Sequence, residues 1–325
     1  KILKKQKEII LELETVIKNL FQLLKKKSFG KFLIKNFFQI ILKMKFINKD
    51  LNLTYYNQPY PYLIIENFFK KEFYDIMENK FPKIEDFKKQ KNNIRRMNYD
   101  TSVNDNLYEN LIKNIKEFKE LHNYIYSKEF LNYFINLFKK DIEKEINKNN
   151  LKNIFTYNFQ SDPYEVDKII SKKDLKDNHK NDKILYPRLD LGMGILGYGK
   201  NTGGKGIHVD NPQRLISILL YFGGFESMTG GELRIWRKEK DNLVISNVIK
   251  PKPNSLVASL QSNISFHDVN PVTEIIGTRN ACYIAISSND KIWKEIELNE
   301  FNQKYHKNRL IPKYSFIREI KNIFK

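Results

Sequence analysis

The sequence contains a single cysteine, Cys282, among its 325 residues. This excludes an intrachain disulfide and a zinc site built of cysteines, and it leads us to expect a reducing, cytoplasmic compartment. No apolar run reaches the roughly 18 residues that a membrane-spanning helix needs. We see no signal-peptide pattern, but the first residue is Lys1 rather than methionine, so a longer natural chain is left open.

Arginine and histidine are scarce, whereas lysine is abundant, and the formal net charge is +19. One interpretation is binding to nucleic acid or to an anionic membrane. We favour the other, in which a general bias toward Lys, Asn and Ile produces the charge. The excess is uneven, because residues 1–50 hold 13 lysines against 4 acidic residues.

Apolar residues recur at helical spacing over residues 1–26, and a second basic, apolar segment covers 32–46. This pattern predicts a helical hairpin that packs on the rest of the chain or forms a homodimer with a second copy. Membrane-surface contact by residues 1–50 is the alternative, since a basic amphipathic helix can adsorb to anionic lipid.

The middle of the chain predicts a short strand over 62–65, a helix over 70–79 and further helices across about 105–148. Residues 160–183 are polar and charged, which favours an inserted surface loop, a candidate lid. We interpret His122 and His179, which lie in these two regions, as ordinary surface or packing residues.

The sequence pattern changes from helical to strand-like at Tyr186. Short strand-like segments such as "RLISILLYF", "LVISNVIKP" and "ACYIAISS" are separated by Gly, Pro and Asn turns. Helices followed by many short strands predict an α+β fold with a β-sandwich or jelly-roll core. The glycine-rich pieces "NTGGKG", "TGGE" and "YFGGF" lack the spacing of a phosphate-binding loop, and we interpret them as turns.

Three side chains in this strand-rich part form a candidate metal site. His208 and Asp210 are two residues apart, so on an extended segment they share a face, and His267 begins another strand-like stretch. Two histidines and one carboxylate are the facial triad of non-haem Fe(II) oxygenases, which leaves three coordination positions open. A His-x-Asp pair alone is weak evidence for a metal site, so the interpretation depends on the sequence around it.

The strings "GYGKNTGGKGIHVDNPQRLISILLYF", "TGGELRIW" and "FHDVNPVTEIIGTR" resemble the 2-oxoglutarate- and Fe(II)-dependent dioxygenases of the prolyl 4-hydroxylase type. "HVDNP" and "GGELRI" are similar to strings of the hypoxia-sensing prolyl hydroxylases. The resemblance is strong over about 186–288. It implies a double-stranded β-helix (cupin-like) core with flanking helices. The expected domains are a basic helical extension at 1–50, a dioxygenase domain at 51–290 with helical support at 66–150 and the core at 186–290, and a basic helical tail at 291–325.

The resemblance also assigns roles. His208, Asp210 and His267 match the Fe(II) ligands. Arg279, twelve residues past His267, matches the residue that pairs with the distal carboxylate of 2-oxoglutarate, and Tyr198 and Tyr221 match tyrosines that bind this co-substrate. The implied activity is hydroxylation of an unactivated C–H bond with O2, Fe(II) and 2-oxoglutarate, giving succinate and CO2, with ascorbate as a further candidate cofactor.

Two alternatives stay open. The chain could be a catalytically silent binding or assembly module with the same fold, although all the expected ligands are present. It could also be a nucleic-acid dealkylase of the same superfamily, but that branch has a second arginine six positions after the first, where this chain has Ala285. We therefore expect a peptidyl or small-molecule substrate rather than nucleic acid, and the resemblance slightly favours a prolyl or other peptidyl one.

Overall fold

A computed structural model describes residues 46–48, 51–83, 89–90, 93–99, 105–160, 183–194, 206–223, 225, 227–294, 296 and 300–305. The chain divides into two compact units, Lys1–Lys49 and Asp50–Lys325. Among the described residues, no helix combines the length and the apolar character needed to cross a membrane.

The described strands of the second unit form a nine-stranded sheet and a three-stranded sheet. The large sheet has the order β1-β2-β10-β7-β12-β6-β4-β3, with β5 pairing in parallel with β6 and the other pairs antiparallel. Its strands are β1 (Asn52–Tyr56), β2 (Tyr62–Glu66), β3 (Lys89–Gln90), β4 (Asn93–Tyr99), β5 (Asn158–Phe159), β6 (Ile184–Gly194), β7 (Arg214–Tyr221), β10 (Leu256–Leu260) and β12 (Arg279–Ser288). The small sheet has the order β11-β8-β9, from β8 (Leu233–Glu239), β9 (Asn242–Ile249) and β11 (His267–Val269).

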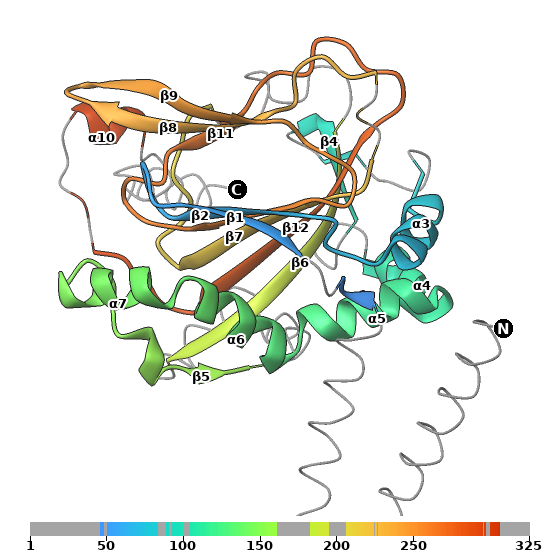
Figure 1. Cartoon of the computed structure of the whole chain (residues 1–325), viewed down its shortest axis with the longest axis horizontal. Helices are drawn as coiled ribbons and strands as arrows, with labels where there is room; N and C mark the ends of the chain where they lie inside the picture. Colours follow the sequence, from blue (N-terminus) through green and yellow to red (C-terminus); the bar gives the residue numbers. More distant parts are fainter. Residues whose placement is uncertain are drawn as a thin grey trace, which may run out of the picture. The chain divides into compact units, whose positions relative to one another are not determined.

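The two sheets face each other across one hydrophobic core (Figure 1). The large sheet contributes Tyr62, Tyr221, Val257 and Ala281, and the small sheet contributes Leu233, Ile235 and Ile249, to a single buried cluster. Because side chains alternate across a strand, this cluster identifies the inner face of each strand. The predicted double-stranded β-helix core is confirmed.

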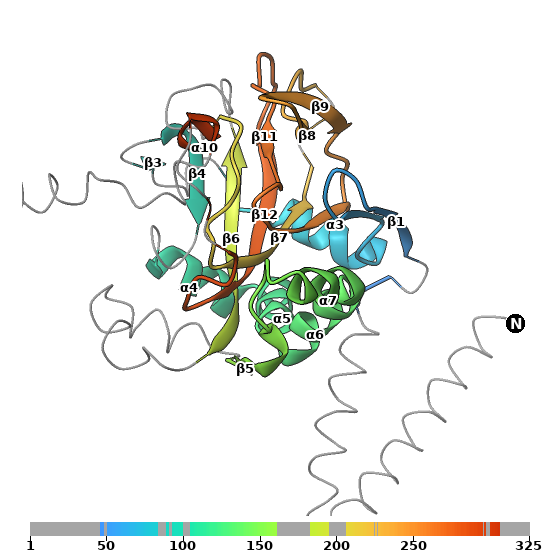
Figure 2. The same ribbon diagram turned by 90° about the vertical axis from the view of Figure 1, so that its left-hand side faces the viewer.

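Helices cover the other face of the large sheet, opposite the small sheet (Figures 1 and 2). They are α3 (Lys71–Asn79), α4 (Asp105–Asn114), α5 (Lys116–Ile125), α6 (Lys128–Leu137) and α7 (Lys139–Asn147), followed by the short 3-10 helix η2 (Ile154–Thr156), and α10 (Glu300–Tyr305) lies nearer the small sheet. In α5, Phe118, Leu121 and Ile125 recur at helical spacing and are buried. The hydroxyl of Ser127 accepts a hydrogen bond from Phe130 N at 3.1 Å and so caps the start of α6.

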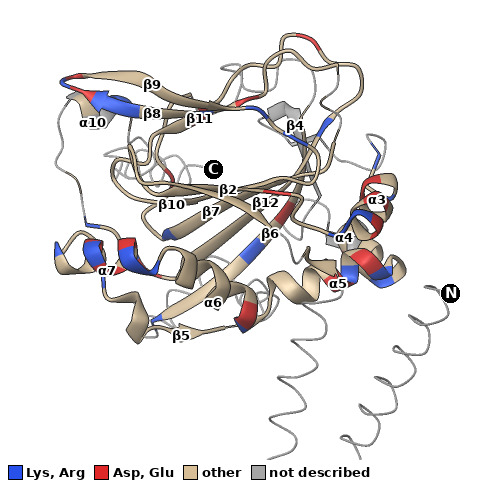
Figure 3. Cartoon of the chain, in the orientation of Figure 1, with Lys and Arg blue, Asp and Glu red and all other residues tan. Residues whose placement is uncertain are grey.

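Charges of both signs alternate on α3, α5 and α7, whereas most of the strands carry few charges (Figure 3). Several of these charges pair along one helix, as Lys71 does with Asp75 at 2.6 Å and Lys139 with Glu143 at 3.8 Å. Mixed signs are typical of a solvated helix surface rather than of a single-sign patch for an anionic partner.

The local predictions are confirmed where the structure describes them. The predicted strand and helix are β2 and α3, the segment 105–148 is helical as α4 to α7, and the "TGGE" glycines form a turn with φ of +85° at Gly230 and +79° at Gly231. His122 is a packing residue, since its Nδ1 lies 2.8 Å from the Tyr108 hydroxyl. Outside the described residues lie the predicted hairpin up to residue 45, residues 161–182 of the predicted insert (160–183), which include His179, and the predicted tail (291–325) beyond residue 305.

Candidate metal and co-substrate site

His208, Asp210 and His267 lie together between the two sheets. One ligand atom from each, two imidazole nitrogens and a carboxylate oxygen, lies within 4.8 Å of the others. The two histidines form an isolated antiparallel bridge, with N–O distances of 3.1 and 3.0 Å in the two directions, and their ring centroids are 4.6 Å apart. His267 begins β11 as predicted, whereas His208 stands in this bridge rather than in a regular strand.

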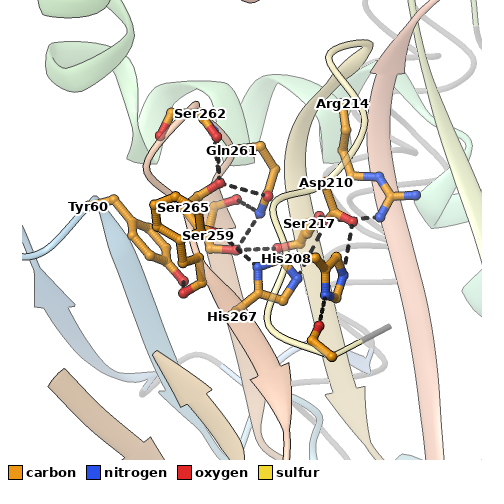
Figure 4. Close-up of polar contacts among 12 residues, drawn as sticks. Tyr60, His208, Asp210, Arg214, Ser217, Ser259, Gln261, Ser262, Ser265 and His267 are labelled. Atoms are coloured by element: carbon orange, nitrogen blue, oxygen red, sulfur yellow. Dashed lines mark hydrogen bonds and ion pairs between the residues drawn. The ribbon is translucent and has the colours of Figure 1, made fainter. Parts of the chain in front are cut away.

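Both histidines present the same nitrogen to the site. Nδ1 of His208 lies 2.8 Å from the Gly206 carbonyl oxygen, and Nδ1 of His267 lies 2.8 Å from that of Ser265 (Figure 4). A carbonyl oxygen only accepts, so each Nδ1 carries the proton and each Nε2 offers a lone pair. The Nε2 atoms of His208 and His267 lie 3.9 and 3.8 Å from the oxygens of Asp210.

A set of hydrogen bonds holds the side chain of Ser265, the residue whose carbonyl group lies behind His267. The Ser265 hydroxyl donates to Gln261 Oε1 at 3.1 Å and accepts from Ser262 N at 2.9 Å, and Gln261 Nε2 donates to the Ser259 hydroxyl at 2.8 Å (Figure 4). Partners of this kind fix the ring orientation of a metal-binding histidine. The sequence alone does not point to these residues, because nothing in the spacing of three serines and a glutamine indicates that they gather here.

Asp210 is buried and held by two donors on the same oxygen, Oδ2. Ser217 Oγ donates to it at 2.6 Å and Arg214 Nη1 at 3.0 Å, whereas Oδ1 faces His208. Burial raises the pKa of Asp210, but the Arg214 charge and the Ser217 hydrogen bond lower it, as His267 and His208 do when they are protonated, and the pKa lies well below its usual value. The carboxylate is therefore ionised at neutral pH.

These residues fit a divalent transition-metal ion. Two neutral imidazole nitrogens and one ionised carboxylate are the donor set suited to Fe(II), and three protein ligands leave other positions open for small molecules. The two carbonyl groups behind the histidines keep both rings in the tautomer that can bind a metal.

Arg279 is fully buried at the start of β12, with 0% of its surface exposed. Its Nε donates to the Gly231 carbonyl oxygen at 3.1 Å, Nη1 to the Tyr283 hydroxyl at 3.1 Å and Nη2 to the Tyr221 hydroxyl at 3.4 Å. The guanidinium carbon also lies 5.1 Å from the centroid of the Tyr221 ring. Burial raises the pKa of Tyr221 to about 12, although the nearby Arg279 charge acts in the opposite direction, so its hydroxyl keeps its proton.

Arg279 and the histidine–aspartate group use the same face of the large sheet. On β7, Tyr221 and Ser217 both face inward, and they pair with Ala281 and Ala285 of β12. The structure thus brings the predicted Tyr221 to Arg279, and it brings Ser217 to Asp210. Tyr198 lies outside the described residues.

One segment of the chain matches a known protein family. Residues 193–286 match the model of the 2OG-Fe(II) oxygenase superfamily, which confirms the resemblance at that level for this segment. None of the curated proteins matches the sequence.

Solved structures give the following similarities. A prolyl 4-hydroxylase from Phytophthora capsici is 16% identical at a TM-score of 0.37, with 80% of this chain and 68% of that chain covered. A prolyl hydroxylase from Trichoplax adhaerens, solved with a peptide fragment of the hypoxia inducible factor oxygen degradation domain, is 14% identical at 0.34, covering 70% and 83%. A 2OG-Fe(II) oxygenase family oxidoreductase from Burkholderia pseudomallei is 15% identical at 0.25, covering 39% and 58%.

Proposed function

We propose that this chain, whose residues 193–286 match the 2OG-Fe(II) oxygenase superfamily, is a 2-oxoglutarate- and Fe(II)-dependent dioxygenase that hydroxylates an unactivated C–H bond in the manner of the prolyl 4-hydroxylases. Succinate and CO2 are the co-products. His208, Asp210 and His267 hold the iron, and Arg279 with Tyr221 holds the distal carboxylate of 2-oxoglutarate.

The metal supplies the activation of O2 when it is bound, and the protein supplies placement. The Gly206 and Ser265 carbonyl groups keep the two histidines in the required tautomer. Arg214 and Ser217 hold Asp210 by one oxygen, which leaves Oδ1 as the ligand oxygen. The surrounding strands bury Asp210, so bulk water does not compete for its carboxylate.

The observation that carries the proposal is the position of Arg279 and Tyr221 relative to the metal-binding group. Ser217 and Tyr221 are four residues apart on one face of β7, or roughly 13 Å along the strand. This arrangement, with a metal-binding group toward one end of the strand and a buried guanidinium toward the other, suits a co-substrate with a chelating group at one end and a carboxylate at the other. A buried guanidinium whose donors lie in one plane is the group that binds a carboxylate bidentately. We propose Tyr198 as a further contact to 2-oxoglutarate.

For the substrate, we propose a prolyl or other peptidyl residue, with a small molecule as the second choice. The "HVDNP" and "GGELRI" strings support this choice through their similarity to the hypoxia-sensing prolyl hydroxylases. A nucleic-acid substrate is disfavoured, because Ala285 occupies the place of the second arginine and is a buried part of β12.

The test is anaerobic loading with Fe(II), followed by measurement of O2- and 2-oxoglutarate-dependent succinate release, with and without ascorbate. A silent module would release no succinate above the protein-free background. His122→Ala is the matched control for a His208→Ala variant, since His122 lies outside the site and packs against Tyr108. Proline-containing peptides and free amino acids are then screened for the mass gain of one oxygen atom.

A further inference from the structure

Tyr283, to which no sequence pattern points, lies beside the candidate co-substrate site. It stands on β12 four residues after Arg279, on the same inner face as Ala281, and packs against the core between the sheets. Its hydroxyl accepts a hydrogen bond from Arg279 Nη1 at 3.1 Å. The Tyr283 side chain therefore runs along the strand toward Arg279.

The ring of Tyr283 needs the space above a glycine on the neighbouring strand. Gly192 of β6 pairs directly with Ala281. A methyl group on Gly192 would lie 2.7 Å from Cδ2 of Tyr283 and closer still to Cε2. Gly192 has no positive φ, so its small size, rather than its backbone freedom, is what the site uses. Because Gly192 and Ala281 are both small, the paired strands leave the space that the Tyr283 ring occupies.

Three segments thus fix the orientation of the Arg279 guanidinium. Its Nη1 donates a hydrogen bond to the Tyr283 hydroxyl, Nη2 to the Tyr221 hydroxyl and Nε to the Gly231 carbonyl oxygen. Each of these bonds restricts the rotation of a long side chain, so the guanidinium plane is set before any ligand arrives. Binding then loses less conformational entropy than it would with a mobile arginine.

We propose that Tyr283 is a positioning residue of the co-substrate site, which holds Arg279 in the plane that takes up the distal carboxylate, and that Gly192 is the residue that admits its ring. This inference rests on the proposed function, because it supposes that Arg279 binds 2-oxoglutarate. Beyond the proposed function, it assigns a positioning role to Tyr283 and explains why a small residue, Gly192, stands on the neighbouring strand β6.

The test is titration calorimetry of 2-oxoglutarate into protein loaded with Mn(II) under anaerobic conditions, together with a separate titration of Mn(II). Loss of one hydrogen bond in Tyr283→Phe should weaken 2-oxoglutarate binding by about three- to tenfold, with the Mn(II) affinity unchanged. Gly192→Ala should weaken it at least as much by displacing the ring. Tyr55→Phe is the matched control, because it removes a tyrosine hydrogen bond, to Asp141 on α7, away from the site.

The double variant Gly192→Ala with Tyr283→Phe separates a shared mechanism from two unrelated defects. If both residues act through the ring, its loss of affinity stays well below the product of the two single effects. In a Tyr283→Ala background, Gly192→Ala should no longer lower the thermal unfolding midpoint, because the clash has gone. Should Gly192→Ala fail to fold alone, Tyr283→Phe by itself and the double variant of Gly192→Ala with Tyr283→Ala, which removes the clashing ring, still decide the matter.

Two failures are distinguishable. If wild-type protein binds Mn(II) but no 2-oxoglutarate, the proposed function is wrong and the role of Tyr283 falls with it. If wild type binds 2-oxoglutarate and Tyr283→Phe binds it equally well, the role of Tyr283 alone is overturned. Equal weakening by the Tyr55→Phe control would also overturn it, since the effect would then be a general loss of stability.

Discussion

Replacing Arg279 by lysine tests the co-substrate assignment most directly. Lysine keeps the positive charge but lacks the planar fork of donors. In the wild type, this buried guanidinium makes hydrogen bonds to Gly231, Tyr221 and Tyr283 at 3.1 to 3.4 Å. A single ammonium group cannot keep all three bonds and also make two bonds to a carboxylate.

The magnitude follows from the lost bond to the ligand. A hydrogen bond to a charged group contributes about 1.5–3 kcal/mol, so losing one should weaken 2-oxoglutarate binding roughly 10- to 150-fold. Arg279→Ala should weaken it further. The affinity for Mn(II) should change less than about twofold, since none of the hydrogen bonds described for Arg279 goes to His208, Asp210 or His267 and the ligand charges are unaltered.

The measurement is calorimetric titration of the metal and of 2-oxoglutarate separately, with thermal unfolding as the check on folding. Arg237→Lys is the matched control, because this arginine is exposed on β8 and pairs with Glu239 at 2.5 Å. The assignment of Arg279 is refuted if Arg279→Lys weakens Mn(II) binding as much as 2-oxoglutarate binding, or if it leaves 2-oxoglutarate binding intact.

Three further predictions concern the metal ligands and the turns. His208→Ala should abolish succinate release and Mn(II) binding while the circular dichroism spectrum is retained; full turnover would remove His208 from the iron site. Without metal, the ionised Asp210 stabilises the folded state above its unfolded pKa of about 4, and this contribution is lost as the pH falls because its folded pKa is lower. Wild type should therefore lose more unfolding free energy than Asp210→Asn between about pH 5 and pH 3 in urea titrations, and parallel curves would contradict the charge pairing. Gly230→Ala should lower the unfolding free energy by about 1–3 kcal/mol more than Gly277→Ala. Both have positive φ, but only the Gly230 substitution overlaps a backbone carbonyl, that of Pro271, and equal melting temperatures would refute this.

The sequence predicted the architecture because its patterns are local. Strand alternation from Tyr186 onward and helical spacing over 105–148 depend on which face of one element is apolar, and each segment carries that information itself. The candidate ligands His208, Asp210, His267 and Arg279 were also found from the sequence, because their strings resemble those of a family in which the same residue types recur.

The tertiary structure decided how these residues are held. Arg214 and Ser217 fix the carboxylate of Asp210, Gln261 and Ser265 support His267, and Gly192 makes room for Tyr283. These contacts depend on the register between strands that are distant in the sequence. A single chain offers no signal for such a register, because serine, glutamine and glycine are common in strands and turns for other reasons. The identity of the candidate ligands could be inferred from the order of the residues, whereas the orientation, burial and charge environment of their side chains follow only from the pairing of the strands.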